Sequence, residues 1–273
     1  MILGMKVRKH DLQDILKFDP SILEFHFSDS DLNLELDENF EQQLIVHCYE
    51  YFDRKLLDIT SKKETNQIHS KEKTIELVQM AIEKTKSLGT QFKGTPAIIL
   101  HPGGYSLNEV NENESNEMKR EISNSIKQLD LKGVNFLLEN MPPYAWFFGG
   151  RWNSNTFLSA SEMINYSKET GLKVCFDLCH SQLYCNKNKK SLIDELELVG
   201  PFTDHFHLSD ADDVDGEGLQ IGEGNVNFEK IIPILNKFND KSFAIEVWKG
   251  HEQGGKGFKF FLDEIIKRGL LVH

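Results

Sequence analysis

The amino-acid sequence predicts a single (β/α)₈ barrel, a closed ring of eight parallel strands surrounded by helices. The first observation is the length of 273 residues, because such a barrel typically needs about 250. The second is a repeated alternation of short apolar runs with amphipathic segments, which indicates a parallel sheet. The third is that six apolar runs end on a histidine or an acidic residue: His47, His101, Glu139, Asp177, His207 and Glu246. An open doubly wound sheet is the alternative, but it would not bring six strand ends to one point.

The first half of the chain contains four expected strands, at 2–7, 21–28, 44–47 and 97–101. Each is an apolar run that is too short for a helix and is typical of a strand buried on both faces. A short helix is expected over 10–17, and an acidic loop follows the second strand. A longer helix is expected over 72–88, because Ile75, Val78 and Ile82 form an apolar face and Gly89 follows.

The second half of the chain repeats the pattern, with expected strands at 135–139, 173–177, 205–208 and 242–247. The acidic stretch 108–119 is expected to be a loop that runs into a solvated helix. Further helices are expected over 159–170, near 190–199, over 227–238 and over 256–267. Because no low-complexity linker interrupts the alternation, residues 1–273 are expected to form one domain.

Composition narrows the class of protein. The formal net charge of −12 disfavours a protein that grips nucleic acid through a broad basic face. The four cysteines form no CxxC pair and no secretory framework. No apolar run approaches the roughly 18 residues of a membrane span. We therefore expect a cytoplasmic protein without a membrane partner.

The alternation of side chains along each strand tests whether the six polar strand ends could meet. Residues two apart on a strand share a face. The neighbours on the ligand-bearing face are Ile45, Ile99, Leu137, Cys175, His205 and Ala244. The opposite face is uniformly bulky and apolar, as a helix-covered surface should be: Val46, Leu100, Leu138, Phe176, Phe206 and Ile245. Active sites of this fold lie at the carboxyl ends of the strands, so the polar ends are expected to share one site.

Carboxylates and imidazoles gathered in one place would repel each other or stay unsatisfied. A divalent cation removes that cost, because it takes oxygen and nitrogen donors. We therefore expect a divalent metal ion at this site. The donor types do not distinguish Zn²⁺, Mn²⁺, Co²⁺, Fe²⁺ and Mg²⁺.

Several short motifs resemble those of the xylose isomerase-like TIM barrels. VCFDLCH at 174–180 is similar to the endonuclease IV pattern, in which a strand ends Asp-x-Cys-His. The segments LHPGG, LLEN, FHLSD and IGEGNVNF resemble stretches that occur in several branches of the superfamily. The superfamily contains sugar and sugar-phosphate isomerases and epimerases of carbohydrate metabolism, together with the endonuclease IV repair enzymes. The resemblance covers nearly the whole chain from the second strand onward.

The resemblance implies roles for five residues. Glu139, Asp177, His207 and Glu246 resemble the four metal ligands of the single-metal sugar isomerases. In that branch the two glutamates also move a proton at the carbon beside the substrate carbonyl, so Glu139 and Glu246 are the expected catalytic pair. His180 is expected at the rim of the site, close to substrate.

The resemblance leaves the number of metal ions open. His47 and His101 resemble two further ligands of the multi-zinc endonuclease IV site, but such histidines also occur in isomerase-like members. Endonuclease IV carries an Asp-x-His element after its seventh strand, whereas this sequence reads DVDGEG there. Asp215 and Glu217 could replace that element, yet the histidine is missing. One or two metals are therefore expected rather than three.

The favoured function is metal-dependent isomerisation or epimerisation of a small sugar or sugar phosphate. The loop after the fifth strand is rich in aromatic residues that could wall a pocket or form a flap or dimer contact: Tyr144, Trp146, Phe147, Phe148 and Trp152. Arg151 and Lys249 could meet a phosphate or hydroxyl. His26 lies where the family often places a polar substrate contact, with a wall histidine as the alternative. His251 is expected to lie in a turn, and His10 carries no signal.

Two alternatives remain. An endonuclease IV-like phosphodiesterase would cleave abasic-site DNA with paired metals, but the loop after the second strand is acidic: Asp29, Asp31, Glu35, Asp37 and Glu38. Nucleic acid is therefore not the expected partner. A barrel that binds a metabolite without catalysis is the second alternative. Sugar-isomerase-like barrels are often dimers or tetramers, so a homo-oligomer is compatible with the sequence.

Overall fold

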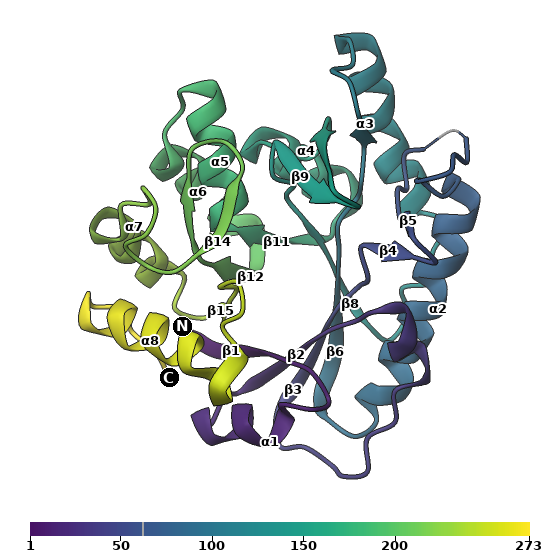
Figure 1. Ribbon diagram of the computed structural model, residues 1–273. Coiled ribbons are helices and arrows are strands. Elements are labelled where there is room, and N and C mark those ends of the chain that lie inside the picture. Colours follow the sequence, from purple (N-terminus) through teal and green to yellow (C-terminus); the bar gives the residue numbers. More distant parts are fainter. Residues whose placement is uncertain (62) are drawn as a thin grey trace.

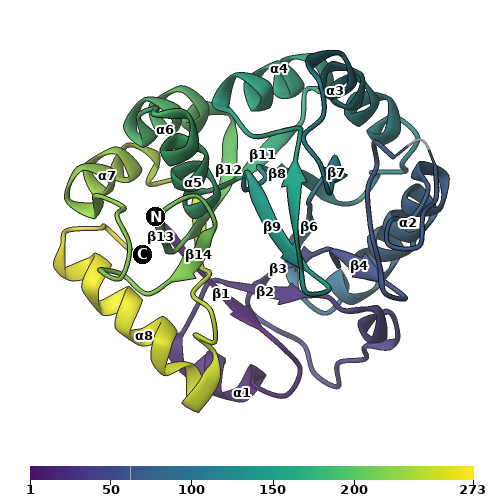
Figure 2. The ribbon, with the colours of Figure 1, turned by 45° about the horizontal axis from the view of Figure 1, so that its top comes forward.

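The computed structural model, which describes residues 1–61 and 63–273, contains a closed barrel of parallel strands (Figures 1 and 2). Around the ring the strands are β1 (Ile2–Val7), β15 (Ser242–Ile245), β12 (Thr203–Leu208), β11 (Lys173–Asp177), β8 (Asn135–Glu139), β6 (Lys93–Leu100), β3 (Gln43–His47) and β2 (Ile22–His26). The first and last strands close the ring, with Ile2 paired to Ser242. The predicted (β/α)₈ barrel is confirmed, and an open sheet is excluded.

Helices cover the outside of the barrel (Figure 2). They are α1 (Leu12–Ile15), α2 (Lys71–Gly89), α3 (Glu112–Ile126), α4 (Ala160–Thr170), α5 (Leu178–Asn188), α6 (Leu192–Val199), α7 (Phe228–Leu235) and α8 (Glu252–Lys267). Short 3₁₀ turns follow α1 and α7 and the second strand, at Leu16–Phe18, Asn236–Phe238 and Asp29–Asn33. Among the described helices, none is long and apolar enough to cross a membrane.

The core has two parts, and both follow the predicted alternation of side chains. The large apolar cluster between strands and helices contains every residue predicted to face outward, from Val46 to Ile245. A separate small cluster fills the barrel interior: Ile22, Ile45, Ala97, Ile99, Leu137 and Cys175. The interior above this cluster is left to polar side chains, which places the site at the carboxyl ends of the strands.

Two segments differ from the expected pattern, and the start of α8 agrees with it. α5 begins directly after β11, although a helix was expected only near 190–199, because the Asp177 carboxylate caps it by accepting the His180 backbone N–H at 2.6 Å. The aromatic stretch after β8 is not a plain loop. It forms an antiparallel sheet of β9 (Tyr144–Phe147), β10 (Gly150–Ser154) and β7 (Tyr105–Ser106). The segment Gln253–Gly255 inside α8 has left-handed backbone angles, so the regular helix starts near the predicted Lys256.

Candidate metal centre

Four predicted ligands meet at the carboxyl ends of neighbouring strands. One donor atom from each of Glu139, Asp177, His207 and Glu246 can be chosen so that all lie within 4.8 Å of one another. His207 Nδ1 lies at the middle of the group, 3.1 Å from Glu139 Oε1 and 2.8 Å from Glu246 Oε2. Asp177 Oδ2 is 3.9 Å from the same nitrogen. A single cation placed among these four donor atoms could replace their contacts with one another.

An asparagine links two of the strand ends that carry the site. Asn140 follows β8, and its Oδ1 accepts the backbone N–H of Asp177 at 2.7 Å. Its Nδ2 donates to the carbonyl oxygen of Asp177 at 3.0 Å. Because the amide makes both bonds, β8 and β11 are held together at their ends, and the adjacent Glu139 and Asp177 are fixed relative to each other.

A second group of charged residues supports the site from inside the barrel. Glu24 is fully buried, and it accepts from His205 Nε2 at 2.9 Å and lies 3.0 Å from His207 Nε2. Lys6 is paired in register with Glu24 and forms ion pairs with Glu24, at 3.3 Å, and with Glu246. A carboxylate on the far nitrogen of a histidine ligand fixes its tautomer and orientation. Glu24 therefore directs His207 Nδ1 toward the three other predicted ligands.

Sequence reasoning assigned no role to Glu24 or Lys6. Each carries a charge inside a strand whose neighbours are apolar, and a buried charge is costly unless it is paired. That signal was present in the sequence. The pairing was not, because only the register of β1 against β2 brings the two residues together.

Three further histidines surround Glu139. His47 Nε2 is 3.1 Å from Glu139 Oε2, and His101 Nε2 is 3.4 Å from Glu139 Oε1. His180 Nδ1 is 3.6 Å from Glu139 Oε1 and 2.8 Å from the Asn140 carbonyl oxygen, to which it donates in the tautomer protonated at Nδ1. His47, Glu139 and His207 form a second potential ligand group, and His101, Glu139 and His180 form a third. All the predicted histidine ligands therefore reach the same glutamate.

The pKa values of the three carboxylates in the centre are shifted in different directions. Burial alone would raise the pKa of Glu139, but His207 and His101 hold that pKa well below its usual value. Burial would also raise the pKa of Glu246, which Lys6 and His207 hold well below its usual value. Burial does raise the pKa of Asp177; His180 opposes the increase, and the charges of Glu139 and Glu246 add to it. A cation beside Asp177 would relieve this crowding of negative charge.

The side chains present fit a divalent metal ion. Three carboxylates and one imidazole suit a first-row transition metal, with Mg²⁺ less favoured because of the nitrogen donor. Both ring nitrogens of His101 are buried without a hydrogen-bond partner among the described residues. Nδ1 forms an ion-pair contact with Glu50 Oε1 at 3.3 Å, and Nε2 forms one with Glu139 Oε1 at 3.4 Å. Glu139, Asp177, His207 and Glu246 could hold one ion, and His47, His101 and His180 could supply donors for another.

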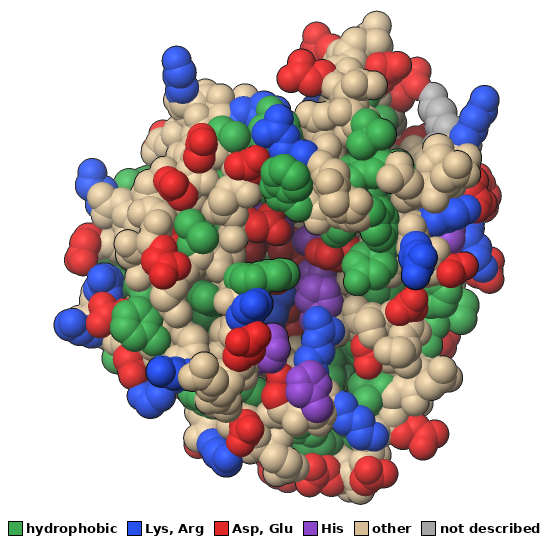
Figure 3. Space-filling view, in the orientation of Figure 1, with side chains coloured by type: hydrophobic (Ala, Val, Ile, Leu, Met, Phe, Trp, Pro, Cys, Tyr) green, Lys and Arg blue, Asp and Glu red, His purple; other side chains and the backbone are tan. Residues whose placement is uncertain are grey.

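A cavity of about 480 Å³ opens above the centre. Its lining includes Asp177, His180 and Glu246 and four of the other predicted site residues, His26, His101, Glu217 and Lys249. Sequence reasoning missed further lining residues, chiefly Lys6, Arg8, Glu50 and Trp248. Figure 3 shows histidine side chains in the hollow near the middle of this face, with basic and acidic side chains around it.

The predicted aromatic wall lies elsewhere. Among the described residues that line the cavity, Tyr144, Trp146, Arg151 and Trp152 do not occur. Trp152 is 3% exposed and donates its indole N–H to the Phe147 carbonyl oxygen at 3.3 Å, so it packs the small sheet together.

Arg151 and Asp215 contact each other outside the cavity. The Arg151 guanidinium stacks over the Tyr144 ring at 4.3 Å. Its Nη1 is 3.3 Å from Asp215 Oδ2. Asp215 is therefore directed to Arg151, whereas Glu217 lies 3.9 Å from His180 Nε2 in the cavity wall. Of these two predicted extra ligands, only Glu217 approaches the centre.

Comparison with known proteins agrees with the architecture. A model of the xylose isomerase-like TIM barrel family matches residues 18–264. An uncharacterised protein of Methanocaldococcus jannaschii is 25% identical over 217 residues, covering 78% of this chain and 67% of that protein. A solved D-tagatose 3-epimerase-like protein superposes with a TM-score of 0.68 at 19% identity, covering 98% of this chain and 99% of that chain. The 3-keto-D-glucoside 4-epimerase YcjR of E. coli superposes with a TM-score of 0.66 at 13% identity, with coverage of 98% and 99%.

At these identities the two structural likenesses speak for the fold alone. The family match is of a different kind, because it extends over most of the chain and agrees with the motifs quoted from the sequence. The chain belongs to the xylose isomerase-like TIM barrel family.

Proposed function

We propose that this protein is a divalent-metal-dependent epimerase or isomerase of a small sugar or sugar phosphate. The observation that carries the proposal is the convergence of Glu139, Asp177, His207 and Glu246 within 4.8 Å, beside a cavity of about 480 Å³. That volume lies within the roughly 300–1,000 Å³ of small-molecule sites. The proposal takes residues 1–273 as one catalytic domain that acts in the cytoplasm, alone or as a homo-oligomer.

The two glutamates are the proposed acid–base pair. When bound, the metal ion would supply Lewis-acid polarisation of a substrate carbonyl and thereby acidify the neighbouring C–H. Glu139 and Glu246 both have a lowered pKa and are ionised at neutral pH, so either can accept that proton. Glu139 is the last residue of β8 and Glu246 follows β15, and β11 and β12 lie between these two strands in the ring. One glutamate can therefore act on each face of a substrate carbon.

Epimerisation follows when one glutamate removes the proton and the other returns one to the opposite face. Positioned acid–base groups contribute roughly 10²- to 10⁴-fold in rate. His180 is the proposed contact to a substrate oxygen, because its Nδ1 is engaged by the Asn140 carbonyl and its Nε2 faces the cavity beside Glu217.

The substrate is proposed to be a ketose or its phosphate. Solved relatives of the same fold are described as a D-tagatose 3-epimerase-like protein and an L-ribulose 3-epimerase, and both names refer to ketoses. Lys249 and Arg8 line the cavity and have no ion-pair partner among the described residues. Their charges support a phosphate at the end of the sugar away from the metal. His26 would lie against the sugar as part of the same wall.

The test is proton exchange at the substrate carbon. Metal-loaded protein is incubated in deuterium oxide with D-tagatose, D-fructose, L-ribulose and their phosphates, and deuterium at carbon is followed by NMR. The proposal expects incorporation with at least one ketose, and loss of incorporation in Glu246→Gln with the metal still bound. Absence of exchange across the panel, in protein that holds its metal, contradicts it.

A phosphodiesterase that cleaves abasic-site DNA is the second candidate. The observation that favours it is the three histidines around Glu139, which could hold a second metal ion. Paired metals would activate a water and stabilise the leaving oxygen. The same preparations are therefore given a duplex with one abasic site. Cleavage without ketose exchange would reverse the ranking of the two functions.

A further inference from the structure

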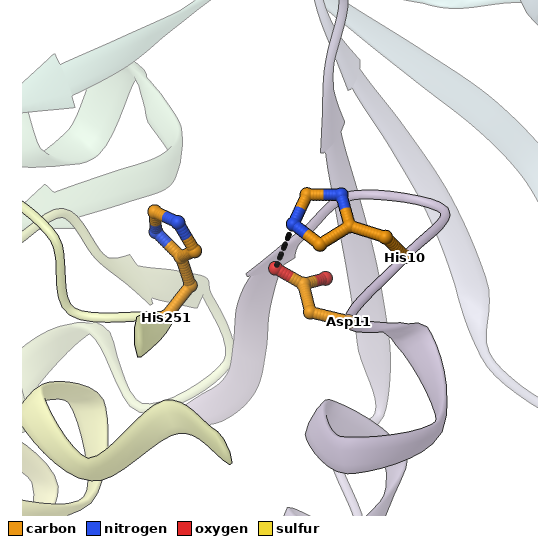
Figure 4. Close-up of side chains that lie close together, drawn as sticks. All are labelled: His10, Asp11 and His251. Atoms are coloured by element: carbon orange, nitrogen blue, oxygen red, sulfur yellow. Dashed lines mark ion pairs between the residues drawn. The ribbon is translucent and has the colours of Figure 1, made fainter. Parts of the chain in front are cut away.

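A group of three side chains at the rim of the cavity lies apart from the central ligands. His10 and Asp11 belong to the loop between β1 and α1, and His251 precedes α8 (Figure 4). The loops come from opposite ends of the chain, and they meet because β1 pairs with β15. One donor atom from each of the three side chains lies within 4.8 Å of the other two. The His10 and His251 rings face each other edge-on, with centroids 6.3 Å apart.

Asp11 has a buried carboxylate oxygen that makes no hydrogen bond to the described residues. The residue is 7% exposed, and its Oδ1 accepts the backbone N–H of Arg8 at 2.7 Å. The other oxygen, Oδ2, is buried and has no hydrogen-bond partner within 1–61 and 63–273. It lies 3.9 Å from His10 Nε2 (Figure 4). An unsatisfied carboxylate oxygen is costly to bury, and here it is turned toward two imidazoles.

We propose that His10, Asp11 and His251 bind a transition-metal ion of the zinc type at the cavity rim. Two imidazole nitrogens and one carboxylate oxygen are a donor set that Zn²⁺ accepts, with one position left open. Neighbouring donors in a tetrahedral zinc site lie roughly 3.4 Å apart, so the group must contract slightly. The His10 side chain is 74% exposed and is free to turn.

The position of the ion follows from the lining of the cavity. Asp11 and His251 both line it, and so does Lys249 beside His251. Two of the three proposed ligands therefore place the ion beside the cavity, while His10 reaches it from the solvent-exposed side. The ion would also tie the first and last loops of the barrel together, next to Gln253–Gly255, where the backbone is left-handed. This role is separate from the central metal, because none of its ligands is a central ligand.

The experiment is a zinc titration of the chelator-stripped 273-residue chain, followed by calorimetry and by a colorimetric zinc assay. The wild type is expected to bind one more equivalent of Zn²⁺ per chain than the double variant H10A/H251A. Asp11→Asn keeps an oxygen for the Arg8 N–H but removes the charge, and it should weaken this equivalent at least roughly tenfold. His273→Ala is the matched control, because it removes a histidine near the C-terminus that bonds the Asn239 carbonyl.

Each outcome decides the proposal. Loss of one equivalent in H10A/H251A but not in H273A, with circular dichroism unchanged, supports the rim site. Equal zinc stoichiometry and affinity in the wild type, H10A/H251A and D11N overturns it. Occupancy of the central site does not confuse the reading, because the central ligands are intact in every variant and the difference between variants is what is measured.

Discussion

Replacing Glu24 by glutamine tests whether the buried carboxylate behind His207 prepares the centre for metal. In the native chain Glu24 Oε2 accepts from His205 at 2.9 Å, and Oε1 lies 3.0 Å from His207 Nε2 and 3.3 Å from Lys6 Nζ. Three donors therefore share one carboxylate. Glutamine offers a single acceptor oxygen, so its amide N–H₂ must face at least one of those donors.

Two losses follow from that substitution. His207 is less firmly held in the tautomer that presents Nδ1 to the centre. Lys6 keeps only one carboxylate partner, Glu246, and draws that ligand away from the metal. Changes to groups that orient a metal ligand typically cost 10- to 100-fold in affinity, which is about 1.4–2.8 kcal/mol. Because both losses act on ligands, we expect E24Q to fall in the upper half of this range.

The assay is calorimetric titration of chelator-stripped protein with Mn²⁺ and Zn²⁺, with thermal unfolding measured on the same samples. Glu50→Gln is the matched control, because Glu50 also faces a histidine, with Oε1 3.3 Å from His101 Nδ1. If the metal lies among the four central ligands, E50Q should change affinity by no more than about twofold. Wild-type affinity in folded E24Q, or a larger loss in E50Q, would refute the reasoning.

Three further predictions concern catalysis, pH and stability. Glu139→Gln should lower ketose deuterium exchange by roughly 10²- to 10⁴-fold, measured by NMR at saturating metal; exchange at the wild-type rate would exclude Glu139 as the base. Burial alone would raise the pKa of Glu50, but the His101 imidazolium holds that pKa at about 2. The ionised Glu50 carboxylate therefore stabilises the folded protein fully at any pH above the usual pKa of a glutamate. This stabilisation is lost as the pH falls toward 2. The melting temperature of metal-free protein should therefore fall less between pH 5 and 2 in E50Q than in the wild type, and parallel curves would contradict this. Trp152→Ala should cost about 3–5 kcal/mol in urea unfolding, whereas Trp146→Ala, at a side chain 56% exposed, should cost within about 0.5 kcal/mol; equal costs would disprove the packing role.

The barrel could be predicted because its signals are local. Each strand can be recognised by an apolar run in the sequence. The alternation of side chains along the run distinguishes Val46, which faces the helices, from Ile45, which faces the interior. The six polar strand ends could be predicted to meet because a closed parallel ring brings strand ends together, and the family resemblance singled out four of them as the expected metal ligands. No contact had to be known to predict that Glu139 and Glu246 meet.

The remainder depends on contacts between distant segments. Lys6 and Glu24 become a supporting pair only through the register of two strands. α5 was not predicted, because its first residue is determined by the N-cap at Asp177 and not by an amphipathic pattern. His10 sits at no strand end and has no local signal, and it gains a partner in His251 only when the ring closes.

The aromatic stretch after β8 shows a further limit. Composition alone could not say whether Trp152 turns toward a substrate or into a small sheet. The antiparallel pairing with β9 decides the matter, because it buries the indole against the hairpin. Cavity walls are therefore harder to predict than cavity floors, since the walls come from loops and the floor comes from strands.

The central claim is that Glu139, Asp177, His207 and Glu246 hold one divalent ion. Anomalous diffraction from crystals grown with Mn²⁺ or Zn²⁺ tests it most directly. We predict a strong anomalous peak about 2.0–2.2 Å from one donor atom of each of these four side chains. A metal-loaded crystal with no peak there, or with its ion bound only by other residues, would contradict a metal site at these four residues.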